Sequence, residues 1–333
     1  MTPPIKDRMT RTEWRAGVAL AFILALRMLG LFLVLPVFSV FARTLPGGDN
    51  IFMAGLAFGV FGLAQAFMQI PFGIASDRFG RKPVIVAGLL VFALGSGIAA
   101  WAPDLTWLAL GRAVQGAGAI SAAVTAFLAD VTRDSVRTKS MAMVGGSIAL
   151  MFALSLVFSP ALAGWVGLSG IFALTGVLAM LAIAMVIWVA PAEPQEHRPS
   201  DMQHLRAGMA EVLRHRGLMR LNLGVFVLHA VQLAMWMALP ALLVSAGLAK
   251  SSHGHIYLPA VAASLVVMGG VLFPMERRGR LRAAFLMAVA LIGAVQLALW
   301  ALADAKPGLW TLGLLLFVFF IGFNTLEASQ PSL

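Results

Sequence analysis

Four ionisable residues stand inside long apolar stretches of the sequence, where a charge is expensive. They are Arg27, Arg112, His229 and Glu327. Arginine does not lose its proton in proteins, whereas histidine and glutamate can take up and release one. We therefore expect the arginines to face a partner or a wet cavity. His229 is either a proton carrier or a packed, hydrogen-bonded histidine, and Glu327 is a gate, a proton carrier or one half of a structural ion pair.

Amide and aromatic side chains recur at helical spacing around these residues. Gln115 lies one turn from Arg112, and Gln65 and Gln69 are four residues apart. Such patterns predict polar lines along cavity walls, although glutamines also join helices by ordinary hydrogen bonds. The predicted substrate cavity consists of Arg27, Gln65, Gln69, Arg112, Gln115, Asn222, His229, Gln232 and Trp236, the last four on one helical face.

A charged segment at residues 73–83 separates two apolar runs and must turn in water. Residues 77–81 read acid, arginine, any residue, glycine, arginine. The same order occurs again at residues 276–280. The repeat indicates two related halves. We interpret the segment as a conformational latch formed by Gly73, Asp77, Arg78, Gly80, Arg81, Lys82 and Asp130; the alternative is that its charges only anchor the topology.

Composition excludes several classes of protein. The chain is 60% hydrophobic and only 11% charged, far from the globular norm, so we expect an all-α integral membrane protein. No cysteine occurs, and no catalytic triad, metal-ligand spacing or phosphate-binding loop is found. We therefore predict no catalytic residue, metal or cofactor. The excess of 24 Lys and Arg over 14 Asp and Glu lies in loops, which argues against nucleic acid as a partner.

Runs of about 20 apolar residues predict the membrane spans. We expect ten, near 14–42, 51–75, 83–102, 105–130, 139–164, 169–191, 218–247, 255–275, 283–303 and 308–333. Lys and Arg gather in alternate joints, which places the amino terminus and both charged segments in the cytoplasm. The predicted organisation is a six-span half at 1–191, a cytoplasmic linker with a short amphipathic helix at 192–217, and a second half at 218–333. The last run lacks a basic flank, so we expect this half to be incomplete.

Three segments resemble motifs of the major facilitator superfamily. The charged segment matches its loop signature at Gly73, Asp77, Arg78, Gly80, Arg81 and Lys82; residues 110–118 resemble its fourth-span motif, and residues 159–164 resemble its fifth-span antiporter motif, with Ser159 and Ala163 in place of two glycines. The patterns at residues 29–37 and 324–333 are similar to the drug:proton antiporter branch.

This resemblance implies a bundle of two pseudo-symmetric six-span halves that works by alternating access, with ten spans in this chain. It also implies that Arg81 pairs with Asp130, and that Asp77 contacts an eleventh span that the sequence does not contain. We expect a secondary active transporter of the bacterial inner membrane, a monomer among lipids, that exports small amphipathic or cationic molecules in exchange for protons. The alternatives are a facilitator or importer on the same fold, or an inactive truncated fragment.

Overall fold

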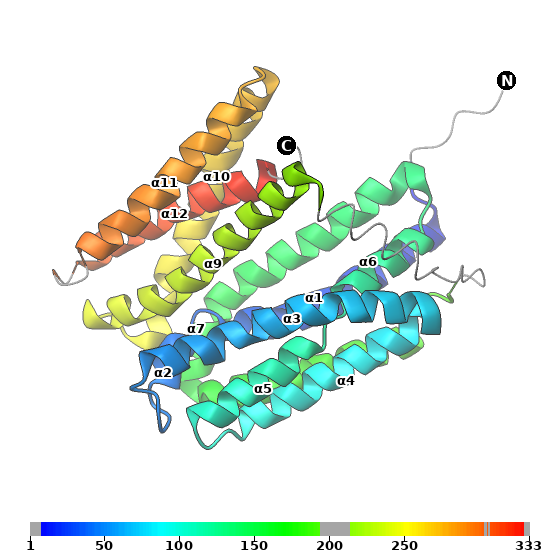
Figure 1. The fold of residues 1–333 in the computed structure, drawn as a ribbon, viewed down its shortest axis with the longest axis horizontal. Coiled ribbons are helices and arrows are strands. Elements are labelled where there is room, and N and C mark those ends of the chain that lie inside the picture. Colours follow the sequence, from blue (N-terminus) through cyan, green and yellow to red (C-terminus); the bar gives the residue numbers. More distant parts are fainter. Residues whose placement is uncertain (1–7, 194–213, 303–304, 306, 330–333) are drawn as a thin grey trace. The chain divides into compact units, whose positions relative to one another are not determined.

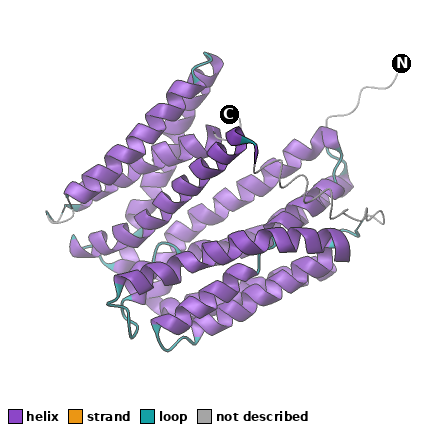
Figure 2. Ribbon diagram, viewed as in Figure 1, coloured by secondary structure: helices purple, strands orange, loops and turns teal. Residues whose placement is uncertain are grey.

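The computed structural model describes residues 8–193, 214–302, 305 and 307–329, and within these ranges every regular element is a helix (Figure 2). The amphipathic helix expected in the linker falls largely on residues outside them. In chain order the elements are α1 (Arg11–Val34), α2 (Phe38–Ala42), α3 (Ile51–Phe79), α4 (Arg81–Ala100), α5 (Leu105–Ala117), α6 (Ser121–Asp130), α7 (Asp134–Trp188), α9 (Arg216–Ser245), η1 (Lys250–Ser252), α10 (Gly254–Arg277), α11 (Leu281–Ala301) and α12 (Leu309–Ser329).

The predicted all-α membrane architecture is confirmed. The described residues contain nine helical stretches that are long and apolar enough to cross a membrane. One of them, α7, has 55 residues, and Gly167 interrupts its helical backbone with φ 68°. Only glycine adopts such a backbone routinely. Because α7 covers two predicted spans, the nine stretches account for the ten runs of the sequence.

Two predicted spans are broken where the sequence analysis expected continuous helix. The first span ends at Val34 and resumes as the short α2, because Pro36 has no N–H to continue the helical hydrogen bonds. The fourth span divides into α5 and α6 around Gly118, whose ψ of 56° lies outside the helical range. A side chain on Gly118 would meet the carbonyl oxygen of Gly88 at 2.4 Å, so the break is packed tightly against α4.

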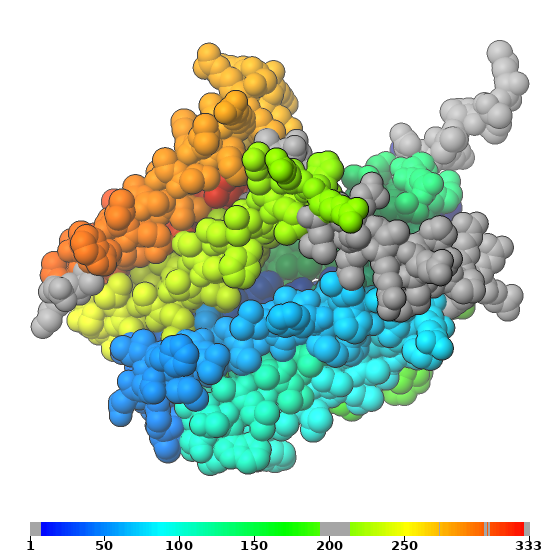
Figure 3. Space-filling view, viewed as in Figure 1, coloured from blue at the N-terminus to red at the C-terminus, as the bar shows by residue number. Residues whose placement is uncertain are grey.

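The helices cluster into two compact units (Figure 1). Unit 1 takes its described residues from 8–155 and 165–193. Within it, α3 and α4 both pack against α5, and the three lie side by side on the face seen in Figure 3. The core combines α1, α4, α6 and the second part of α7, with Leu20, Ile85, Phe127 and Val186 fully buried. Large apolar side chains such as Phe67 (77% exposed) remain on its surface, as expected for helices that contact lipid.

Unit 2 takes its described residues from 156–164 and from residue 214 onward. Its helix α12 packs against α9, α10 and α11. The aromatic centre of this unit is Trp236, whose ring lies edge-on to Tyr257 at 5.2 Å and 6.2 Å from Phe320. The segment 156–164 of α7 belongs here because it packs against the start of α10: a side chain on Gly254 would meet the carbonyl oxygen of Leu156 at 3.0 Å.

The repeated charged segment places a glycine with positive φ between two helices in both units. Gly80 separates α3 from α4 with φ 96°, and Gly279 separates α10 from α11 with φ 67°. Both values favour glycine, since other side chains are strained there. The two turns differ in length, since Gly80 alone separates α3 from α4, whereas residues 278–280 separate α10 from α11.

Candidate functional site

The charged segment of unit 1 forms a closed cluster around Arg81. Its Nε donates a 2.8 Å hydrogen bond to Oδ2 of Asp130 at the end of α6, and its Nη1 bonds both the carboxylate of Asp77 and, at 2.8 Å, Oγ of Ser76. One guanidinium therefore joins the end of α3, the start of α4 and the end of α6. Desolvation acts against its charge, but the two carboxylates neutralise it.

Glu193 completes this cluster, and sequence reasoning missed it. Its two carboxylate oxygens accept hydrogen bonds from the backbone nitrogens of Arg81 at 3.1 Å and Lys82 at 2.6 Å. These N–H groups belong to the first two residues of α4 and have no partner inside the helix. The carboxylate therefore caps α4 and complements its dipole. The Nζ of Lys82 also donates to the carbonyl of Ala190 at 2.9 Å. The end of α7 is thus tied to the charged segment.

The remaining residues of the segment have simpler surroundings. The carbonyl of Gly73 accepts a 2.7 Å hydrogen bond from Ser76, and Arg78 is exposed, with its guanidinium 5.3 Å from the ring centre of Phe79. In the second copy, by contrast, none of the described carboxylates lies within ion-pair distance of Arg277 or Arg280. The positive-φ glycine is repeated in unit 2, but among the described residues the ion-pair cluster is not.

A second ion pair at the same end of unit 1 joins α1 to the turn before α7. Arg133 donates to Glu13 from Nε at 2.7 Å and from Nη2 at 3.0 Å, and Glu13 also caps α1 reciprocally with Thr10. The hydrogen bonds to Glu13 raise the pKa of Arg133, so this cation keeps its proton. The T-x-x-E pattern of Thr10 to Glu13 was the readable signal for the cap.

Arg27 is fully buried in unit 1 and touches only neutral groups among the described residues. Its Nη2 donates to Oε1 of Gln65 at 2.7 Å and, at 3.5 Å, to the carbonyl of Gly118; its Nη1 lies 3.5 Å from Oγ of Ser121. The structure thus brings together two of the predicted cavity residues. Gln69, one turn along α3, has its Oε1 buried without a partner among the described residues.

Arg112 and Gln115 form a separate polar cluster inside unit 1. Nη1 of Arg112 donates to Oε1 of Gln115 at 2.7 Å, and Nε2 of Gln115 donates to Ser96 at 2.9 Å and Thr175 at 3.5 Å. All four side chains are buried. These bonds join α4, α5 and α7, but the Nε of Arg112 has no partner among the described residues, and its Nη2 has only a 3.5 Å contact with the carbonyl of Phe58.

Both buried arginines also lie over phenyl rings. The guanidinium carbon of Arg27 is 5.5 Å from the ring centre of Phe92, and that of Arg112 is 4.4 Å from the ring centre of Phe61. The two rings belong to one apolar cluster. The negative faces of the rings offset part of the cost of two buried positive charges.

In unit 2 the structure pairs the two titratable residues that the sequence analysis treated as rivals. Nε2 of His229 on α9 lies 3.7 Å from Oε2 of Glu327 on α12, and the two side chains are 47% and 53% exposed. Phe323, one turn from Glu327, presents its ring edge-on to the imidazole at 5.9 Å. Sequence spacing carried no signal for this pair, because nothing local fixes which face of α12 meets α9.

The other predicted residues of α9 follow a gradient of burial. Asn222 is exposed, Gln232 is half-buried, and Trp236 is 1% exposed in the aromatic centre of unit 2. The structure therefore places Trp236 among packed rings. A neighbouring hydrogen bond from Asn324 to Ser264 at 3.0 Å joins α12 to α10.

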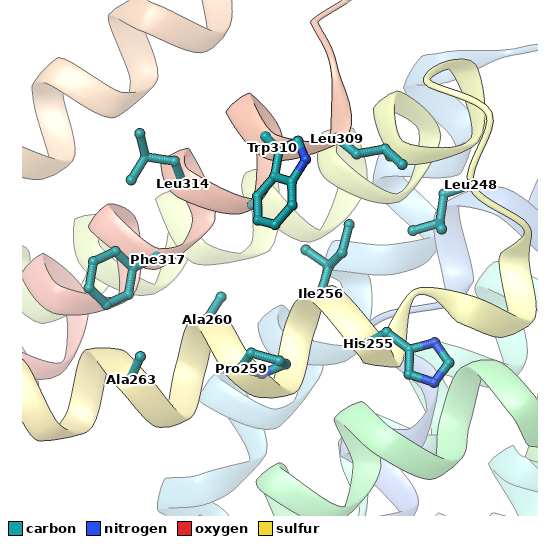
Figure 4. Close-up of a pocket in the computed structure, with 11 residues that line it drawn as sticks. Leu248, His255, Ile256, Pro259, Ala260, Ala263, Leu309, Trp310, Leu314 and Phe317 are labelled. Carbon is teal, nitrogen blue, oxygen red and sulfur yellow. The ribbon is translucent and has the colours of Figure 1, made fainter.

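A groove of about 620 Å³ lies between α10 and α12 of unit 2. Figure 4 shows Trp310, Leu314 and Phe317 on α12 opposite Ala260 and Ala263 on α10. His255 is the only ionisable residue of its lining. The groove is apolar, so it lacks the charge pairs found elsewhere in the molecule.

Comparison with known proteins agrees with this architecture. Residues 20–333 match the family model described as Major Facilitator Superfamily. The chain is 39% identical to the inner membrane transport protein YajR of Escherichia coli over 98% of its own length and 71% of that protein's length. It is also 34% identical to the class B tetracycline resistance protein of Escherichia coli over 41% of the chain and 34% of that protein.

Solved structures show the same fold. A bacterial homolog of the human lysosomal transporter Spinster superimposes with a TM-score of 0.74 over 98% of this chain and 75% of that chain, at 17% identity. The motif resemblance of the sequence to the major facilitator superfamily is confirmed, and so is the inner-membrane, multi-pass location. The chain belongs to the major facilitator superfamily of membrane transporters.

Proposed function

We propose that this transporter exports small amphipathic molecules in exchange for protons, and that His229 and Glu327 carry the proton. The observation behind the proposal is the 3.7 Å approach of their side chains inside apolar helices. The relative named for tetracycline resistance supports the direction of transport, since export is one way for a membrane transporter to give resistance. The apolar spans of unit 2 offer an amphipathic substrate a matching environment.

The geometry assigns different tasks to the two nitrogens of His229. Nδ1 lies 2.9 Å from the carbonyl oxygen of Val225, and a carbonyl can only accept, so Nδ1 carries a hydrogen. Nε2 is then the atom that gains or loses a proton, and it is the atom that faces Glu327. Protonation of Nε2 creates an ion pair with the carboxylate, whereas deprotonation leaves Glu327 uncompensated.

This arrangement makes the charge state of the pair sensitive to its surroundings. Among the described residues, Glu327 is the only charged group paired with His229. On α10 the neutral Ser264 is hydrogen-bonded to Asn324 of α12. The arginines of α9, Arg220 and Arg216, lie about two and a half and three and a half turns from His229. In the proposed cycle the pair takes up a proton when it faces one side of the membrane and gives it up when it faces the other. Alternating access exposes the pair to one side of the membrane at a time, and so couples proton movement to the exchange of substrate.

The decisive experiment is transport in proteoliposomes under an imposed pH gradient, with proton movement followed by trapped pyranine. The substrates are 4-phenylbutyrate, 4-phenylbutyramide and 4-phenylbutylamine, which share one apolar body. We expect His229→Asn and Glu327→Gln to abolish gradient-driven transport and to spare exchange without a gradient. Matched controls are His255→Asn and Asp49→Asn, which change two exposed groups outside the pair.

The proposal fails if both variants and the double variant still move substrate against a gradient with unchanged pH dependence. If the parental protein transports substrate at the same rate with and without a pH gradient, the facilitator alternative is supported instead. That reading is favoured by Ser159 and Ala163, which replace two glycines of the antiporter motif.

A further inference from the structure

The interior of unit 1 carries positive charge that no acid of this unit offsets. Up to residue 193 the acids of the sequence are Asp7, Glu13, Asp49, Asp77, Asp104, Asp130, Asp134 and Glu193. Asp7 lies outside the described residues, and each of the others stands in a loop, at a helix cap, or in the first or last turn of a helix. Arg27 is about 24 Å from the start of α1, near the middle of the span.

Arg27 also makes few good hydrogen bonds for a fully buried guanidinium. Of its five N–H donors, only one has a partner at a normal distance, Gln65 at 2.7 Å; the contacts with Ser121 and Gly118 are 3.5 Å long. Its Nε has no partner among the described residues. Since a buried unsatisfied donor is costly, these spare donors indicate a site that awaits an acceptor.

A second positive feature meets Arg27 at the break in the fourth span. The helix α6 begins at Ser121 and has no side-chain cap, so its first N–H groups lack the usual acceptor. The contact between Ser121 and Nη1 of Arg27 places this helix start beside the guanidinium. The acid that ends α6, Asp130, is about 13 Å further along the helix and is paired with Arg81. The guanidinium of Arg27 and the amino-terminal end of α6, both positive, therefore lie side by side with no anion between them among the described residues.

We propose that Arg27, Ser121 and the first turn of α6 form a binding site for the carboxylate of an amphipathic substrate. The planar guanidinium offers two parallel N–H groups that match a carboxylate, and the hydroxyl and helix start add further donors. Gln65 and Ser121 are half-buried, so the carboxylate reaches Arg27 by displacing the amide oxygen of Gln65. The phenyl ring of Phe92 completes the site on its apolar side.

This site deepens the proposed function, because it assigns a charge to the substrate. It favours anionic amphiphiles over the cationic ones that the sequence analysis also allowed. Arg112 differs in access. Its Nε also has no partner among the described residues, but Gln115, which holds its Nη1, is fully buried along with Ser96 and Thr175, whereas Gln65 beside Arg27 is half-buried.

The test is equilibrium binding to the full chain in lipid nanodiscs, which needs no pH gradient. The probes are 4-phenylbutyrate, its neutral amide and 4-phenylbutylamine. We expect the carboxylate to bind about tenfold or more tightly than the amide, the worth of a charge-assisted hydrogen bond. Arg27→Gln should remove this preference, Arg27→Lys should keep part of it, and the exposed-loop control Arg43→Gln should leave it unchanged.

Gln65→Ala provides a second test that does not depend on the folding of an Arg27 variant. Removing the amide that occupies Nη2 should raise the affinity for 4-phenylbutyrate several-fold without changing that for the amine. A purely structural role for Arg27 predicts lower stability in this variant and no change in charge preference.

Three results would overturn the site: the amine binding as tightly as the carboxylate, Arg27→Gln weakening all three probes equally, or no carboxylate binding at about 1 mM. An unchanged or lower carboxylate affinity in Gln65→Ala would do the same. If the preference is found but transport ignores the pH gradient, only the proposed proton coupling fails. If gradient-driven transport is found without the preference, only this site fails.

Discussion

Oε1 of Glu193 accepts a 2.6 Å hydrogen bond from the backbone nitrogen of Lys82, while Oε2 of the same carboxylate accepts from Arg81. One side chain at the end of α7 therefore caps α4 and holds the backbone of the residue that joins Asp77 to Asp130. Four helix ends meet through these contacts within unit 1. Their stability and their movement should depend on single side chains.

Glu193→Ala should destabilise the protein by about 1 kcal/mol, the usual worth of a helix cap and its charge. Thermal unfolding of purified protein in detergent, compared with the exposed-loop control Asp49→Asn, measures the effect. Glu193→Gln should recover part of the loss, since an amide oxygen still accepts one hydrogen bond. Equal melting temperatures for Glu193→Ala and the control would show that the cap is not needed.

Arg81→Ala should slow the transport cycle several-fold without reducing membrane insertion, because it leaves Asp77 and Asp130 as two carboxylates with no cation between them. Asp77→Asn should have a smaller effect, since Arg81 keeps Asp130. Each exposed or half-exposed ion pair is worth at most about 1 kcal/mol, so neither change should unfold the chain. Exchange rates and membrane levels are measured together.

The matched control for this latch is Arg78→Ala, which removes an exposed arginine from the same segment. We expect the parental rate from it. If Arg81→Ala and Arg78→Ala behave alike, the segment serves only to anchor the topology.

Gly95→Ala should destabilise unit 1 by about 1–3 kcal/mol, the usual cost of overpacking. A Cβ on Gly95 would lie 2.2 Å from the backbone nitrogen of Gln115, where α4 and α5 interlock. Gly97→Ala, two residues along the same helix, meets nothing within 4 Å and should be neutral or stabilising by up to about 1 kcal/mol. Unfolding curves that rank the two variants in the opposite order would contradict this packing.

Single cysteines should report which polar residues reach water, since the native chain has none. Gln65→Cys and His229→Cys should react with a membrane-impermeant maleimide, because the first side chain is half-buried and the second is exposed. Gln115→Cys should be protected, since its position is fully buried. Fast labelling at Gln115 would place the Arg112 cluster in the water path, as the sequence analysis expected.

The sequence by itself determined the spans, the turns and the family. Hydrocarbon tolerates only runs of apolar helix, so ten runs could be counted, and a charged segment with Gly80 had to turn in water. The repeat around Gly279 followed from the same order of residues. The sequence analysis did not single out Thr10 and Glu13, although their T-x-x-E spacing is a local signal for a helix cap.

Only the tertiary structure decided which side chains meet. His229 and Glu327 are 98 positions apart in the sequence, and Arg27 and Gln65 are 38 apart, so their approach depends on how helices pack. The break at Gly118 depends on close contact with Gly88 in another helix. Apolar periodicity indicates that one face of a helix is buried, but it does not indicate which other helix packs against that face. Charge pairing in a membrane bundle is therefore set by the bundle, because every long-range partner is chosen by packing between helices rather than by spacing along one of them.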